Sequence, residues 1–227
     1  MNEKFLSLLA IIIAIGTLVW QINQDIQGKK EELVIHSYQA DPGYKFKITQ
    51  SNNQVIIPFQ YKILLANTGD PSISFINFKE VQVGTKTDQS RTNALSDVGF
   101  TSEEDKPVRL PFIIKSGEAI VLKHIMPISF EQESINVINQ AYIKENGSDI
   151  YNKDITYYDL LYYSMKAGKD IFGNDLTGNG SRDEIGFPET QLKINNKNVN
   201  QPKFNLIFTS ARNNEFEYTL TVYPGTK

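Results

Sequence analysis

Side-chain oxygens recur at alternate positions in one polar loop of this chain, a spacing that could arrange them around a single calcium ion. Gly180 lies within the loop and permits a sharp turn. Calcium takes about six to eight oxygen ligands, and we expect a bound ion to stiffen the loop without performing catalysis. The residues that we assign to this site are Asp175, Thr177, Asn179, Asp183 and Glu184.

The order of these residues is similar to the D-x-D-x-D-G-x-x-D calcium loops of EF-hand-like and thrombospondin-type repeats. Thr177 and Asn179 stand where those loops carry carboxylates, and Gly186 stands where an EF-hand has its bidentate Glu. Fewer charges predict weaker calcium binding. An exposed turn rich in Gly and Asn is the alternative, and it requires no ion. Apart from calcium, no cofactor is expected.

Four tyrosines fall within seven residues, at 157, 158, 162 and 163. On a helix, Tyr158 and Tyr162 share a face, and Tyr157 and Tyr163 flank it. Buried, these side chains would form the core contact of the helix. Exposed, Tyr157 and Tyr163 would form a binding surface for a protein or a carbohydrate. Both alternatives remain open from the sequence.

No pattern of residues predicts an enzyme. The chain has no Cys, and it contains no G-x-S-x-G segment. His124 shares its parity with Leu122 and Met126, which predicts a core position, and the acidic run at 103–105 is typical of a solvated loop. The net charge of −3 and the lack of a basic, aromatic-rich stretch argue against nucleic acid.

The most informative element lies at the N-terminus. Phe5 to Trp20 reads FLSLLAIIIAIGTLVW and carries no charge. A bilayer core needs about 17–25 apolar residues in a helix, so we predict a transmembrane anchor over residues 1–22, with lipid contacts through Phe5–Trp20. Trp20 would lie at the interface. A cleaved signal peptide and a buried core helix are the alternatives.

The flanking charges predict the orientation of this anchor. Lys4 lies next to the apolar run, whereas Lys29 and Lys30 lie further away and precede two glutamates. The positive-inside rule therefore favours a single-pass protein whose C-terminal domain lies outside the cytoplasm. A domain facing the cytoplasm and a domain secreted after cleavage are the alternatives. Residues 23–32 are mostly polar and are predicted to form a short stalk.

Residues 33–227 are predicted to form one mainly β, antiparallel domain. Apolar and polar residues alternate along 44–48, 59–65 and 216–222, as in strands with one buried face. Five more segments have strand composition, and the polar tract from Gly84 to Lys106 is predicted to be a long loop. The further strands are expected at 33–38, 72–83, 108–114, 119–126 and 203–209.

The middle of this domain, about 129–200, is predicted to be a helical and loop insertion. Apolar residues have helical spacing in Phe130–Lys144 and Asp154–Gly168. Ser129 with Gln132 could cap the first helix. In the second, Thr156 with Asp159 could form a capping box, and Gly168 is suited to the C-terminal cap.

Residues 59–69, FQYKILLANTG, resemble the strand and Asn-x-Gly turn of bacterial immunoglobulin-like, adhesion-type β-sandwiches. The resemblance implies a sandwich and an interaction or spacer role. We therefore expect a membrane-anchored, non-enzymatic interaction or scaffold module with an unidentified protein partner. It would bind through the insertion and the loop 84–106. A carbohydrate-binding sandwich with a structural calcium loop is the alternative function.

Overall fold

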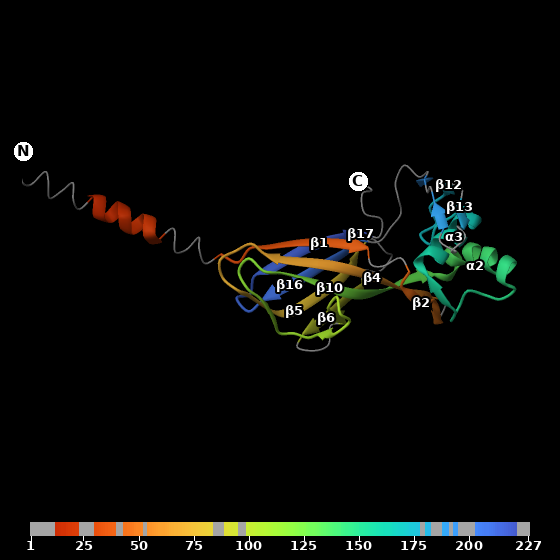
Figure 1. The fold of residues 1–227 in the computed structure, drawn as a ribbon, viewed down its shortest axis with the longest axis horizontal. Helices are drawn as coiled ribbons and strands as arrows, with labels where there is room; N and C mark the ends of the chain where they lie inside the picture. Colours follow the sequence, from red (N-terminus) through yellow and green to blue (C-terminus); the bar gives the residue numbers. More distant parts are fainter. Residues whose placement is uncertain are drawn as a thin grey trace, which may run out of the picture.

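A computed structural model gives the fold of the chain (Figure 1). It describes residues 12–22, 30–39, 43–51, 54–83, 89–94, 99–177, 180–182, 188–190, 193–194 and 203–221.

The first of two larger sheets has the strand order β1-β4-β10-β7-β8, with β3 paired to β4, and every pair is antiparallel. Its centre is the long pair β4 and β10, which runs from Asn67 and Ala119 at one end to Gln54 and Glu131 at the other. Its strands are β1 (Leu33–Gln39), β3 (Thr49–Ser51), β4 (Gln54–Asn67), β7 (Phe100–Thr101), β8 (Pro107–Val108) and β10 (Ala119–Glu131).

The second sheet has the order β17-β16-β5-β6, with β9 paired to β5, and is also antiparallel. Its strands are β5 (Ile73–Val83), β6 (Gln89–Ala94), β9 (Phe112–Ile114), β16 (Lys203–Ser210) and β17 (Glu215–Thr221). Three two-stranded sheets complete the described strands: β2 (Lys45–Lys47) with β11 (Asp154–Thr156), β12 (Leu176–Thr177) with β15 (Lys193–Ile194), and β13 (Gly180–Arg182) with β14 (Pro188–Thr190).

Both larger sheets contribute their inward residues to one hydrophobic cluster. Burial alternates strictly along β4 and β16, because successive side chains of a strand point to opposite faces. Phe78 of β5 meets Phe100 of β7 at a centroid distance of 4.8 Å, so the two sheets share aromatic contacts. The predicted mainly β, antiparallel fold is confirmed.

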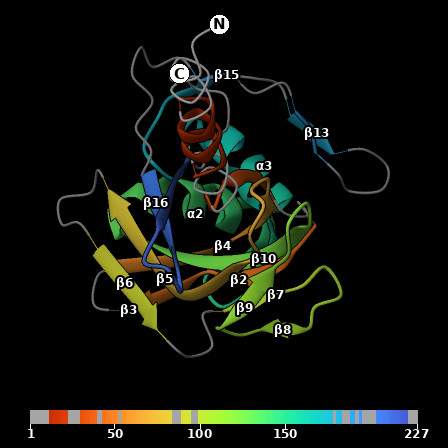
Figure 2. The same cartoon turned by 90° about the vertical axis from the view of Figure 1, so that its left-hand side faces the viewer.

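Two helices gather at one end of the β structure, the end toward which β1 runs (Figure 1). Seen from the end where β1 begins, they lie behind the strands (Figure 2). They are α2 (Gln132–Asn146) and α3 (Tyr157–Ala167), and both fall within the predicted insertion. Thr156 and Asp159 form the predicted capping box, and Gly168 ends α3 in the left-handed conformation with φ 70°.

Two predictions about local structure were wrong, one at the start of α2 and one between β5 and β8. Ser129 does not begin a helix: it lies in β10 opposite Ile56, and α2 starts directly after that strand. The segment from Gly84 to Lys106 is not one loop, because it contains β6 and β7. Strand β6 reads QSRTNA and pairs with β5 at the edge of its sheet, where a strand needs no apolar side chains.

Residues 12–22 are helical. Within the part of the chain that the structure describes, no helix combines the length and the apolarity that crossing a membrane requires. The predicted anchor begins before this part, since residues 1–11 lie outside the described ranges.

Candidate functional site

The predicted calcium loop is described only at its start. Asp175 accepts a hydrogen bond from Lys169 Nζ at 2.7 Å, and Thr177 lies in β12 opposite Lys193. Asn179, Asp183 and Glu184 lie outside the described residues. Among the residues that are described, no group of three or more His, Cys, Asp or Glu could hold a metal ion.

Of the four tyrosines of α3, Tyr162 and Tyr163 are buried, and Tyr157 and Tyr158 are half-buried. Tyr163 is 3% exposed and packs edge-on against Tyr142 at 4.8 Å. Tyr157 is half-buried and packs edge-on against Phe59 at 5.9 Å. A side chain as buried as Tyr163 has no surface to offer a partner, so the partner-binding prediction fails for it. The core alternative accounts for both residues.

Hydrogen bonds connect α3 to α2 and stabilise the loop that follows α3. Tyr163 Oη accepts a hydrogen bond from Asn146 Nδ2 at 2.8 Å. Asp170 is buried, and its carboxylate accepts hydrogen bonds from the backbone of Phe172 and from both nitrogens of Asn174. These bonds close the loop after α3 on itself. The helical end is therefore a packed unit and not a loosely attached insertion.

A buried polar pair joins the two larger sheets. His124 of β10 and Glu80 of β5 approach to 2.8 Å between Nε2 and Oε2, and they are 4% and 6% exposed. Phe78 and Phe100 pack against the imidazole ring, at centroid distances of 5.4 and 4.8 Å. The predicted core position of His124 is confirmed. Its partner Glu80 was missed, because the sequence gives no sign that a glutamate in β5 points inward.

Tyr61, which lies opposite His124 on β4, is also buried. Burial, and secondarily the charge of Tyr157, raises the pKa of Tyr61 well above its ordinary value. Its hydroxyl therefore stays protonated in the folded protein at any pH near neutrality.

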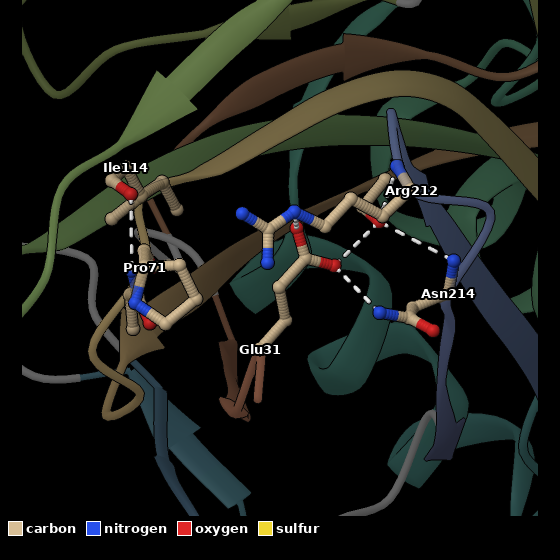
Figure 3. Close-up of polar contacts among 7 residues, drawn as sticks. Glu31, Pro71, Ile114, Arg212 and Asn214 are labelled. Carbon is tan, nitrogen blue, oxygen red and sulfur yellow. Dashed lines mark hydrogen bonds and ion pairs between the residues drawn. The ribbon is translucent and has the colours of Figure 1, made fainter. Parts of the chain in front are cut away.

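The most extensive polar network lies where the chain enters the β structure. Glu31 precedes β1, and its side chain is only 2% exposed. Ser210 Oγ and Asn214 Nδ2 donate hydrogen bonds to Glu31 Oε2, at 2.6 and 2.8 Å (Figure 3). Arg212 Nε lies 3.7 Å from Glu31 Oε1. One buried carboxylate thus binds the whole turn between β16 and β17.

A second turn holds the backbone on either side of Glu31. The backbone amides of Thr68 and Gly69 donate to the carbonyl oxygen of Glu32 at 2.9 and 3.3 Å. A Cβ on Gly69 would lie 2.5 Å from the carbonyl oxygen of Lys30 and 2.7 Å from the amide nitrogen of Glu32. Only glycine allows the two backbones to approach so closely.

Asn67 fixes the conformation of that second turn. Its Nδ2 donates to the carbonyl oxygens of Pro71 and Ile114, at 2.8 and 3.1 Å (Figure 3). Its Oδ1 accepts from the amide of Gly69 at 3.0 Å. Ser116 Oγ in a third turn donates to the carbonyl oxygen of Gly69 at 2.8 Å.

We call this network the junction: Lys30–Glu32 together with the turns 67–71, 114–118 and 210–214 that hold it. Its chemistry is hydrogen bonding and ion pairing, which fix the last residues of the predicted stalk to the β domain. The sequence predicted the Asn-x-Gly turn that begins at Asn67, but Glu31 was assigned to the stalk. Its partners lie about 180 residues away, and nothing local in the sequence indicates them.

Comparisons with known proteins give no family. No family model and no curated protein matches the chain. A crystal structure described as the ApaA protein of Bordetella pertussis shares 11% identity over 87% of this chain and 98% of its own, with a TM-score of 0.34. A Northeast Structural Genomics Consortium target shares 7% identity over 87% and 89%, with a TM-score of 0.36.

A third solved structure is a β-glucosidase involved in saponin metabolism from intestinal bacteria. It shares 9% identity, and the match covers 85% of this chain but 16% of the enzyme, with a TM-score of 0.28. TM-scores this low assign neither a fold family nor an activity.

Proposed function

We propose that the chain is a membrane-anchored, non-enzymatic interaction or scaffold module. The apolar segment Phe5–Trp20 holds the β domain at a bilayer, and the domain lies outside the cytoplasm. The two larger sheets form an immunoglobulin-like sandwich, in keeping with the contacts between Phe78 and Phe100 and between Glu80 and His124. A protein partner binds the end of the domain away from the anchor, at the insertion.

The observation that carries this proposal is the exposure of the helical residues 12–22. A helix of a water-soluble domain buries its apolar stripe and exposes a polar face. This helix is apolar on all sides, and its large side chains are 51–61% exposed. Burying them in lipid would contribute about 10–20 kcal/mol, at about 1.5–3 kcal/mol for each side chain. These side chains are Ile12, Ile13, Ile15, Leu18, Val19, Trp20 and Ile22.

The junction supports the scaffold role. A buried carboxylate and three turns hold Lys30–Glu32, so the β domain is fixed to the end of its stalk. A module whose task is to present a binding surface gains from such a fixed connection, because less conformational freedom is lost when the partner binds.

The anchor predicts how variants of the full-length chain partition. We expect the natural chain to resist extraction from membranes by alkaline carbonate. The double variant Ile12→Lys, Ile13→Lys should move to the soluble fraction, because each charge near the bilayer centre costs about 2.5–3.5 kcal/mol. Gln21→Lys is the matched control: a lysine at the end of the span reaches the interface, so this variant should remain in the membrane.

Extraction of the natural chain by carbonate would contradict the proposal. Equal retention of the natural chain and the double variant would contradict it as well, because the helix would then not be what holds the protein there.

A further inference from the structure

Two pairs of strands connect the junction with the helical end of the domain. β1 leaves the junction at Leu33 and runs toward the helices, and all 7 of its residues pair with β4 (Figure 1). All 13 residues of β10 pair with β4 on its other side, and α2 begins directly after β10, at Gln132. A pull on the two ends of the domain therefore passes from β1 through β4 to β10, and we call these three strands the load path.

Force along the load path loads its strand pairs in shear. The hydrogen bonds of an antiparallel pair are perpendicular to the strands, so sliding one strand along the other strains all the bonds of the pair together. Force across the strands instead opens a pair from one edge, a few bonds at a time. Shear requires the larger force, because many bonds must break in a single step.

Two sets of contacts keep β1 from peeling away from the first sheet. At the start of the strand, the junction holds Glu31 and Glu32. Further along, the backbone amide of Ser37 donates to Tyr218 Oη at 3.2 Å, and Ser37 Oγ lies 2.9 Å from the same oxygen. Tyr218 belongs to β17 of the second sheet, so peeling β1 from β4 also requires breaking its contact with the other sheet.

The opposite edge of the first sheet is joined much more weakly. Two residue pairs connect β7 to β10, and two connect β8 to β7. A force across the strands at this edge has few hydrogen bonds to break before β7 separates. The described sheet is therefore expected to resist force along its strands better than force across them.

We propose that the β domain transmits tension between the membrane anchor and a partner at the helical end, through the load path. The inference rests on the proposed function, which puts the anchor before β1 and the partner at the insertion. Any pull on the bound partner then acts along β1, β4 and β10, in the direction in which the strand pairs are loaded in shear.

The test is forced unfolding of single full-length chains in detergent micelles, with handles attached to pairs of introduced cysteines. The natural chain has no Cys, so each pair fixes the direction of the force. Lys30→Cys with Lys144→Cys pulls along the strands, and Glu103→Cys with Glu217→Cys pulls across them. All four positions are exposed. At equal loading rates, the first rupture along the strands should need at least about twice the force needed across them, because forced unfolding follows the unfolding rate of the loaded path.

A proline in β1 tests whether this strand carries the load. The amide of Ser37 donates to Tyr218 and so points away from β4, which means that the amide of His36 faces β4. His36→Pro should lower the rupture force along the strands by about 1.5-fold, because proline removes that donor, and it should leave the force across the strands unchanged. His36→Ala is the matched control: it keeps the amide and should change neither force.

A force across the strands equal to or above the force along them would overturn the proposal. An equal fractional loss in both directions on His36→Pro would overturn it as well, because β1 would then support the fold in general and not the load path. Carbonate extraction reports separately on the anchor. A natural chain that stays in the membrane but shows no directional difference contradicts only this inference, whereas a chain washed from the membrane contradicts the proposed function.

Discussion

Gly69→Ala is expected to destabilise the β domain by about 1–3 kcal/mol, the usual cost of overpacking. Elsewhere, replacing glycine by alanine stabilises by about 0.4–1 kcal/mol through the unfolded state. Here the added Cβ meets backbone atoms of Lys30 and Glu32 at 2.5 and 2.7 Å, and no side-chain rotation relieves that contact. The steric clash therefore outweighs the stabilisation through the unfolded state, and Gly69→Ala should lower the free energy of unfolding. Thermal unfolding should show the loss, at about 2–4 °C for each kcal/mol in a domain of this size.

The same variant should release Lys30–Glu32 from the junction. Limited proteolysis should then cut the chain between residues 23 and 32 faster than in the natural protein. Asp70→Ala is the matched control, because Asp70 is exposed in the same turn and its side chain can be removed without a steric effect. A Gly69→Ala chain as stable and as protease-resistant as Asp70→Ala would show that the junction does not hold the stalk.

His124→Leu and Glu80→Leu should each cost about 3 kcal/mol or more, because breaking a buried polar pair leaves one partner without its compensating contact. The double variant should cost clearly less than the sum of the two. Two leucines can pack beside Phe78 and Phe100, and no buried carboxylate then remains at position 80. Urea unfolding of the natural protein, the two single variants and the double variant completes a double-mutant cycle. The cycle gives the coupling energy between His124 and Glu80, which we expect to exceed about 1 kcal/mol.

His36→Leu is the control for this cycle, because His36 lies on the exposed side of β1 and should change stability by less than about 0.5 kcal/mol. Strictly additive costs for Glu80 and His124 would show that the pair is not a unit.

The sequence predicts this fold best where one face of a strand is buried. Period-two alternation identified β4 and β17, and the predicted capping box and C-terminal glycine marked both ends of α3. The sequence did not predict strand β6, because its residues QSRTNA show no apolar alternation. It also merged β8 and β9, which are separate strands in different sheets, into one strand at 108–114.

The junction shows why the candidate site was harder to predict than the fold. Glu31 follows two lysines and precedes another glutamate, a pattern typical of an exposed stalk. Its burial depends on Ser210 and Asn214, which only the tertiary structure brings to it. Gly69 likewise looks like an ordinary turn glycine, and its close approach to Lys30 is a property of the folded chain.

The central claim is that the N-terminal helix lies in a bilayer, and Trp20 tests it directly because it is the only tryptophan in the chain. The full-length protein would be reconstituted into vesicles whose lipids carry bromine atoms at defined depths. We predict a blue-shifted Trp20 emission, quenched most strongly by bromines near the headgroups, where interfacial aromatic side chains lie. An emission like that of tryptophan in water, unaffected by bromine at any depth, would contradict the account.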